Sequence, residues 1–341
     1  MKEIIAIKWP LFFLTLFPII FLTSCGNGTT TSKKRADTTS MSAPAIVVPG
    51  FDADSAYYFV ARQLSFGPRV PGTSAHAQCA KWLEETMKQF TPDVIVQEFK
   101  ARVYNSQVLG GKNIIAVFNP QMQRRILLAA HWDSRPYADH DPDPANHGKA
   151  IDGANDGASG VGVLLEIARQ LSRQSPSAGV DIILFDLEDY GPPQDKQTYE
   201  STDMWGLGSQ HWARNPHVPR YTANFGILLD MVGAPNARFP MEGFSMYYAP
   251  DINKKIWTLA GKLGYGEYFI FEQGGYITDD HYYVNKIARI PMINIIHLDE
   301  TSSNGSFYEH WHTVNDNLDQ IDQNTLKIVG EVVLNVIYKG I

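Results

Sequence analysis

Four runs of apolar residues along the chain have the length of β-strands, and each is followed by a residue that can carry charge. Ile, Leu, Val and Phe fill these runs too densely for strands with one face in water, so both faces are expected to be buried. The runs are Arg125 to Ala130 before His131, Asp181 to Leu187 before Glu188, Phe225 to Leu229 before Asp230, and Ile290 to Ile296 before His297. They predict the buried strands of a central sheet.

Segments with helical spacing of apolar residues separate several of these strands. Alternation of helices with buried strands predicts an α/β domain whose central mixed sheet is mostly parallel and is flanked by helices. The expected helices are Asp54 to Leu64, a helix capped by Thr73 or Ser74 that runs through Cys79, Trp82, Leu83 and Met87, and one with Leu164, Ile167, Ala168 and Leu171 on its apolar face; Val94 to Tyr104 and Asn113 to Phe118 are two further expected strands.

The first 45 residues have a different character. Lys2 and Lys8 precede an apolar stretch that is too short for a comfortable membrane span and is typical of a secretory signal. The stretch ends in Leu22-Thr23-Ser24-Cys25-Gly26, which resembles the lipobox of bacterial lipoproteins, where the cysteine is lipidated. We therefore expect a signal peptide at 1–24, lipidated Cys25, a flexible tether at 25–45 and a catalytic domain at 46–341. An ordinary signal peptide or a short anchor, with an incidental cysteine, is the alternative.

Composition narrows the partners of the domain. The net charge of −7 over 341 residues argues against a nucleic-acid partner, because such a surface repels phosphates. Only two cysteines are present, so lipidation of Cys25 leaves Cys79 without a partner for an intramolecular disulfide. We expect an exported, membrane-anchored, periplasm-facing monomer.

Acidic and imidazole side chains gather where the predicted strands end. Ligands bind at the carboxyl ends of parallel strands in open α/β sheets, and several acids at one edge are costly unless a cation compensates their charge. Asp156 lies between glycines in the turn 151–160, where a solvated turn carboxylate is the simpler interpretation. His131 and Asp133 are two residues apart, so both can point toward one mouth. Glu188 and Asp189 are adjacent, which suits one metal ligand beside one free general base.

Imidazole and carboxylate ligands without a cysteine cluster fit Zn²⁺ in an open catalytic site. Other catalytic motifs fail: the chain contains no H-E-x-x-H, no nucleophile elbow, no Walker A motif and no dinucleotide fingerprint. Asp139, Asp141 and Asp143 have the spacing of a calcium loop, but prolines between them and the missing final glutamate argue against calcium binding.

An ordered set of motifs resembles the glutaminyl-peptide cyclotransferases, which share a fold with the dinuclear zinc aminopeptidases. The resemblance covers nearly the whole domain after the tether. The motifs are Lys112-Asn113-Ile114-Ile115, His131-x-Asp133, Gly153-Ala154-Asn155-Asp156, Phe185-Asp186-Leu187-Glu188-Asp189, Leu229-Asp230-Met231-Val232-Gly233-Ala234-Pro235-Asn236, Asp279-Asp280-His281 and Trp311-His312-Thr313.

The resemblance implies a zinc aminopeptidase-like fold and conversion of the N-terminal glutamine of peptides to pyroglutamate with release of ammonia. It implies one Zn²⁺ per chain and roles for the following residues: Asp156, Asp189 and His312 as metal ligands, Glu188 as acid and base, Asp279 holding the substrate amide, Asp230 hydrogen-bonded to Asp279, and Trp311 in the substrate pocket. We also expect Trp205 and Ile277 to line this pocket.

Two other functions stay open on the sequence. His131 and Asp230 could hold a second zinc ion that shares Asp156, as in the dinuclear aminopeptidases. A non-catalytic binding lipoprotein on the same fold is the third possibility. The chain also departs from the animal cyclotransferases, since it has Asp189 where they have glutamate, Thr278 where they have glutamine, and Tyr190-Gly191-Pro192-Pro193 where they have a pocket tryptophan. Trp205 is our candidate to replace that tryptophan.

Overall fold

The computed structural model describes residues 46–198 and 203–341, and the part from Ile46 to Ile341 forms one compact unit. The predicted signal peptide, Cys25 and the tether lie outside the described residues. Within the described ranges, no helix is both long enough and apolar enough to cross a membrane.

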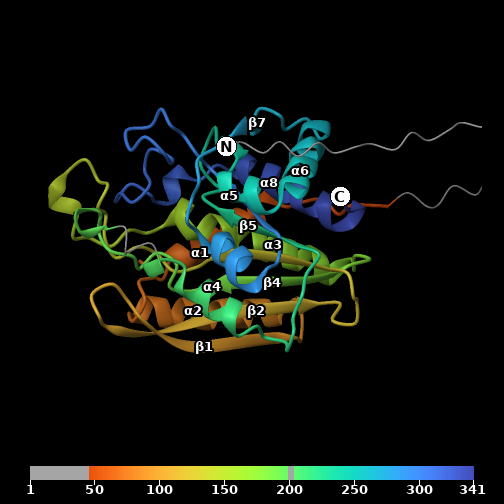
Figure 1. Ribbon diagram of the computed structural model, residues 1–341, viewed down its shortest axis with the longest axis horizontal. Coiled ribbons are helices and arrows are strands. Elements are labelled where there is room, and N and C mark those ends of the chain that lie inside the picture. Colours follow the sequence, from red (N-terminus) through yellow and green to blue (C-terminus); the bar gives the residue numbers. More distant parts are fainter. Residues whose placement is uncertain (1–45, 199–202) are drawn as a thin grey trace, which may run out of the picture. The chain divides into compact units, whose positions relative to one another are not determined.

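A six-stranded mixed sheet organises the compact unit, in the order β1-β2-β4-β3-β5-β8 (Figure 1). β4, β3, β5 and β8 run parallel to one another, whereas β1 and β2 form an antiparallel hairpin that continues the sheet beyond β4, with β2 antiparallel to β4. The mostly parallel α/β fold is therefore confirmed. The strands are β1 Val94–Arg102, β2 Val108–Phe118, β3 Arg125–His131, β4 Gly179–Phe185, β5 Phe225–Asp230 and β8 Met292–Ile296.

The strand boundaries differ from the prediction mainly at β2. This strand begins at Val108, five residues before the expected start at Asn113, because Val108 to Lys112 pair with β1 in the hairpin. These first residues are mostly exposed or half-buried, so they lack the dense apolar pattern that marks the central strands. A dense run of apolar residues predicts a strand that is buried on both faces. It does not reveal strand residues that pair with a neighbouring strand while they stay exposed.

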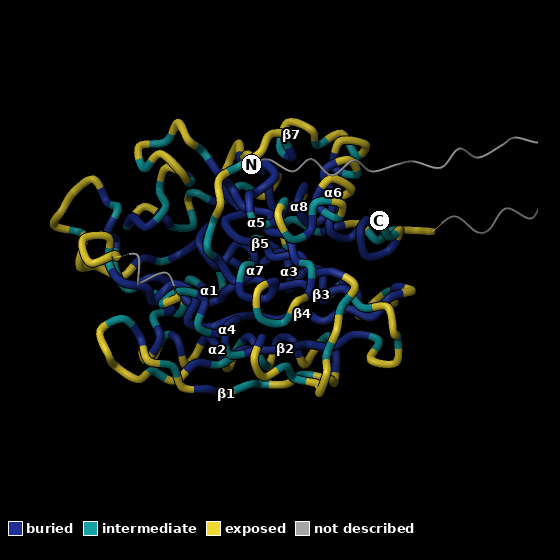
Figure 2. Tube along the Cα trace, in the orientation of Figure 1, coloured by how far each residue is buried: buried dark blue, intermediate teal, exposed yellow. Residues whose placement is uncertain are grey.

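Helices cover both faces of the sheet. Successive side chains of a strand point to opposite faces, so the residues of β2 alternate between two cores. Ile114 and Ala116 point into a core that also holds residues of α1, α2, α3 and α8. Ile115 and Val117 point into a second core with Trp212 from α4. Figure 2 shows the central strands and α3 buried, with exposed residues in the loops at the rim. The helices are α1 Ala53–Leu64, α2 Ser74–Lys88, α3 Gly160–Arg173, α4 Leu207–Arg214, α5 Gly243–Tyr248, α6 Pro250–Lys262, α7 Asp280–Tyr283 and α8 Gln323–Lys339.

The parallel strands place their carboxyl ends at the same edge of the sheet. β3 ends at His131, β5 ends at Asp230, and β4 runs into the segment that carries Glu188. A small second sheet, which pairs β6 (Phe239–Met241) with β7 (Phe269–Gln273), precedes the loop that leads to Asp279. Side chains from distant parts of the sequence therefore meet at one edge.

Candidate active site

Asp156 lies in a tight turn just before α3. Its carboxylate is buried, with the residue only 4% exposed, so the interpretation as a solvated turn residue is wrong. The carboxylate of Asp316 accepts hydrogen bonds from the backbone N–H groups of Asn155 (2.8 Å) and Asp156 (3.0 Å) and fixes the turn. Gly157 follows with φ +96°, and a Cβ there would lie 2.9 Å from His131 Cε1. Only glycine lets the turn approach His131 so closely.

Two groups of potential metal ligands share Asp156. In the first group, His312 Nε2 lies 3.4 Å from Asp156 Oδ2 and 3.3 Å from Asp189 Oδ1. In the second group, His131 Nε2 lies 3.0 Å from Asp156 Oδ1 and 3.3 Å from Asp230 Oδ1. The candidate ligands of the one-zinc site and of the second zinc ion thus lie around the carboxylate of Asp156.

The first group fits zinc on its own atoms. It offers two carboxylates and one imidazole, the donor set of an open catalytic zinc site. Asp189 Oδ2 is buried and has no hydrogen-bond partner among the described residues. Burying such a group without a partner is costly, and a bound cation would remove that cost. In the second group, His131 Nε2 hydrogen-bonds to Asp230, and no carboxylate oxygen of the group is buried without a partner among the described residues, although Nδ1 of His131 is.

Asp133 does not point to the same place as His131, so this part of the prediction is wrong. Its carboxylate accepts the backbone N–H groups of Glu188 (3.1 Å) and Asp189 (3.2 Å), and it lies 3.7 Å from His131 Nδ1. β3 ends at His131, so the two-residue alternation of a strand does not extend to Asp133. Asp133 instead holds the backbone that presents both acids, and it contacts the ring of His131.

Glu188 lies beside the first ligand group without belonging to it. Burial raises the pKa of Glu188 well above its usual range; His131 opposes this shift, and the carboxyls of Asp279 and Asp189 add to it. Burial likewise raises the pKa of Asp230 to about 7. Buried carboxyl groups with raised pKa values are suited to carrying protons near neutral pH.

Asp279 belongs to the same group of acids. It accepts hydrogen bonds from Asn294 Nδ2 at 2.6 Å and from the backbone N–H of Asp280. Burial raises its pKa, and the charge of Asp279 contributes to the raised pKa of Asp230. The hydrogen bond between Asp230 and Asp279 remains a prediction.

The backbone aims several of these side chains by unusual conformations. Leu187, Met231 and His312 have positive φ values of 55°, 48° and 55°. Leu187 directly precedes Glu188, and Met231 directly follows Asp230. Non-glycine residues with such backbones are uncommon and concentrate at functional sites. The chain therefore turns sharply at each strand end that delivers an acid.

A cavity of about 70 Å³ joins the ligand group to the acids. Trp205, Ile277 and Trp311 line it, together with Glu188 and Asp279. The ring of Trp311 stacks on His312 at 3.8 Å between centroids. A larger hollow of about 540 Å³ shares Ile277 with it but contains none of the ligand candidates. The three residues predicted for the pocket are thus in the wall of the cavity that carries the chemistry.

Trp205 reaches the cavity because Gly191 leaves space for it. A side chain on Gly191 would collide with the indole ring. The stretch after Asp189 that lacks a tryptophan in this chain is therefore the stretch against which Trp205 packs. Its ring lies nearly parallel to that of His312, with a 12° angle and 6.4 Å between centroids.

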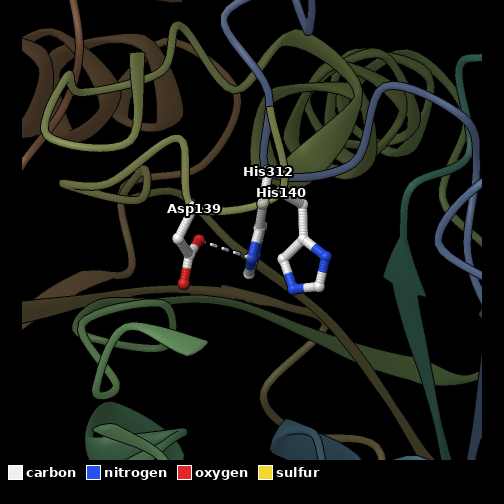
Figure 3. A group of neighbouring side chains, drawn as sticks. All are labelled: Asp139, His140 and His312. Carbon is white, nitrogen blue, oxygen red and sulfur yellow. Dashed lines mark ion pairs between the residues drawn. The ribbon is translucent and has the colours of Figure 1, made fainter. Parts of the chain in front are cut away.

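Three buried residues around the site have no sequence pattern that indicates a role there. Arg135 bonds to Asp139, whose spacing with Asp141 and Asp143 resembles only a calcium loop, and Asp316 holds the turn of Asp156. Figure 3 shows Asp139 and His140 beside the ring of His312, with an ion pair between Asp139 and His312. The contacts of Asp316 with the turn of Asp156 and of Asp139 with His312 join distant segments. Arg135 and Asp139 are only four residues apart, but the contact of Arg135 with Asp189 spans 54 residues, so no local pattern could indicate a role at the site.

Comparison with known proteins places these residues in a wider context. Residues 113–337 match the model of peptidase family M28. The glutaminyl cyclase of Tannerella forsythia is 54% identical, with a TM-score of 0.82 over 85% of this chain and 99% of that one. The glutaminyl cyclase of Bacteroides thetaiotaomicron bound to N-acetylhistamine is 52% identical, with a TM-score of 0.83 over 86% and 99%. A leucine aminopeptidase precursor from the same organism is 51% identical, with a TM-score of 0.83 over 86% and 99%.

Proposed function

The chain belongs to peptidase family M28 and is a glutaminyl cyclase within it, and we propose that its reaction uses one zinc ion held by Asp156, Asp189 and His312. Its substrates are peptides with an N-terminal glutamine, whose side chain closes onto the α-amine to give pyroglutamate and ammonia. The observation that carries the one-zinc proposal is the unpartnered, buried Asp189 Oδ2 in the first ligand group. The second group has its imidazole hydrogen-bonded to Asp230 instead.

Zinc in this position would polarise the γ-carbonyl of the substrate and stabilise negative charge on its oxygen. Residues of the chain transfer the protons and position the substrate. Glu188 accepts a proton from the attacking α-amine, whose pKa is about 8 in free peptides, and delivers a proton to the departing nitrogen. One C–N bond forms to the α-amine, one C–N bond to the amide nitrogen breaks, and ammonia leaves.

Asp279 and the aromatic wall hold the substrate for this step. Asn294 and the backbone of Asp280 fix the Asp279 carboxyl, which we assign to the leaving amide. Trp205, Trp311 and Ile277 enclose a space suited to one small side chain and limit the access of water. Exclusion of water favours ring closure by the internal amine over hydrolysis.

Ammonia release tests the proposed function directly. With a glutaminyl dipeptide as substrate, the purified protein is expected to release one ammonia per pyroglutamyl product. Activity should disappear on chelation and return when about one zinc per chain is added. Release of a free N-terminal amino acid without ammonia, by a protein with two zinc ions, would establish the aminopeptidase function instead.

We propose that the protein is exported and anchored by lipidation of Cys25, with the domain facing the periplasm as a monomer. The motif Leu22-Thr23-Ser24-Cys25-Gly26 supports this proposal. Stable anchoring to a membrane requires more than one acyl chain, and in a lipoprotein these chains are attached to the single cysteine. Loss of Cys25 should therefore release the protein. Cys25→Ala is expected to move the protein from the membrane fraction to another fraction, with Cys79→Ala as the control. An unchanged distribution of Cys25→Ala would contradict the anchor.

A further inference from the structure

Arg135 is a fully buried residue, with 0% of it exposed, and its guanidinium contacts Asp189, one of the proposed zinc ligands. It forms a two-pronged pair with Asp139, from Nε to Oδ1 at 2.8 Å and from Nη2 to Oδ2 at 2.6 Å. Nη1 lies 3.3 Å from Asp189 Oδ1 and 3.2 Å from the backbone oxygen of Asp189. Nη2 also donates to the backbone oxygen of Pro192. One side chain therefore holds Asp189 by both its carboxylate and its backbone.

Asp139 extends this contact to a second ligand. Its Oδ1 lies 3.5 Å from Nδ1 of His312, an ion-pair distance (Figure 3), and this buried nitrogen makes no hydrogen bond among the described residues. Nε2 of the same ring lies 3.4 Å from Asp156 and 3.3 Å from Asp189. The backbone N–H of His140 donates to the backbone oxygen of His312, which joins the same loop to the ligand segment. A metal-bound histidine commonly has a carboxylate on its other nitrogen, which fixes the tautomer and the orientation of the ring.

Arg135 also touches the wall of the substrate cavity. Its guanidinium carbon lies 4.8 Å from the centroid of the Trp205 ring, within the distance of a cation–π contact. Arg135 also balances negative charge, because it pairs with Asp139 and Asp189, and Asp189 belongs to the same ligand group as Asp156. A planar guanidinium suits this position because it binds carboxylates in two directions at once.

We propose that Arg135 and Asp139 are positioning residues that set the affinity of the site for zinc, by fixing Asp189 directly and His312 through Asp139. This inference rests on the ligand set of the proposed function. Neither residue is placed on the substrate or the reacting atoms. Their effect is therefore expected first in metal binding and only then in turnover.

A purely structural role is the competing explanation, and the chain contains a matched pair that separates the two. Arg125 and Asp181 form the same two-pronged contact, at 2.6 Å and 2.7 Å. Both side chains are largely buried, with 11% and 1% exposed. Arg125 begins β3, so this pair lies at the end of the strand opposite His131. Asp181→Asn breaks a comparable ion pair without touching the metal site.

The test measures the zinc dissociation constant of the full-length protein by competition with a chelator, beside urea unfolding of the metal-free protein. Asp139→Asn and Arg135→Lys are each expected to weaken zinc binding by about 10- to 100-fold, the effect that partners of metal ligands commonly have. Asp181→Asn is expected to lower the unfolding midpoint while it leaves the zinc dissociation constant within about twofold of the original. Trp205→Phe serves to show how much of the Arg135→Lys effect comes through the indole.

Unchanged zinc affinity in Asp139→Asn, with a lowered unfolding midpoint, would overturn the proposal. Equal weakening of zinc binding in Asp181→Asn would overturn it as well, because general destabilisation would then explain the effect. If Asp139→Asn does not fold, Arg135→Lys, which keeps the charge, decides by the same measurement. These dissociation constants do not depend on substrate, whereas failure of the proposed function appears in the ammonia assay of the unmodified protein.

Discussion

Replacing Glu188 with glutamine is expected to lower kcat by about 10²- to 10⁴-fold, the range that general acid and base catalysis contributes in enzymes. Glutamine has nearly the same shape but cannot take a proton from the attacking amine. The loss corresponds to roughly 3 to 5 kcal/mol of transition-state stabilisation. Zinc content should stay the same, because Glu188 belongs to neither ligand group. Initial rates of ammonia release and metal analysis of the same sample check both statements.

The matched control for this variant is Glu166→Gln on α3. Glu166 is also buried, at 0% exposure against 8% for Glu188, but it accepts hydrogen bonds from Arg169 and Gln170 away from the cavity. Its loss should reduce stability and leave kcat nearly unchanged. A Glu188→Gln variant that keeps more than about a tenth of kcat would remove Glu188 from the role of proton carrier.

Replacing Asp156 with alanine is expected to abolish stable zinc binding and to reduce kcat/KM by at least about 10³-fold, since the site would lose several kcal/mol of charge stabilisation. Asp156 faces His312 with one oxygen and His131 with the other. No other described residue belongs to both ligand groups. Metal analysis after dialysis and the ammonia assay measure the two effects.

His131→Ala distinguishes one zinc ion from two in the same experiment. If one ion bound by Asp156, Asp189 and His312 serves the reaction, the variant keeps about one zinc per chain. A fall from two ions to one in this variant would show that the second group binds metal in the unmodified protein. Asp156→Ala that retains a full zinc complement would contradict both assignments.

The central strands could be predicted because parallel strands buried on both faces leave a dense apolar record in the sequence. β3 and β5 lie within one or two residues of the expected ranges. The start of β2 could not be predicted, because most of its first residues pair with β1 without being buried. Asp133 shows the same limit, since its direction depends on where β3 ends and not on the spacing of two residues.

The candidate ligands could be named from the sequence because Asp156 lies in a glycine-rich turn, Asp189 follows a recognisable strand, and the ordered motifs, which include His312, resemble a known family. The residues that hold these candidate ligands in place could not be predicted. Asp316 reaches the turn of Asp156 across 160 residues of sequence, and Arg135 reaches Asp189 across 54. Contacts of this kind depend on the packed structure. In the sequence, Asp316 and Arg135 each look like a charged residue of an ordinary surface loop. Burial and geometry are needed to identify them.

The separation of the ligands along the chain has a consequence for how the enzyme matures. Asp156 precedes α3 and Asp189 follows β4, while His312 follows β8, so the three proposed ligands come from distant parts of the fold. The group cannot close until the segment after β8 has docked on the rest of the sheet. We therefore expect zinc bound by all three residues to report that these parts of the domain have assembled.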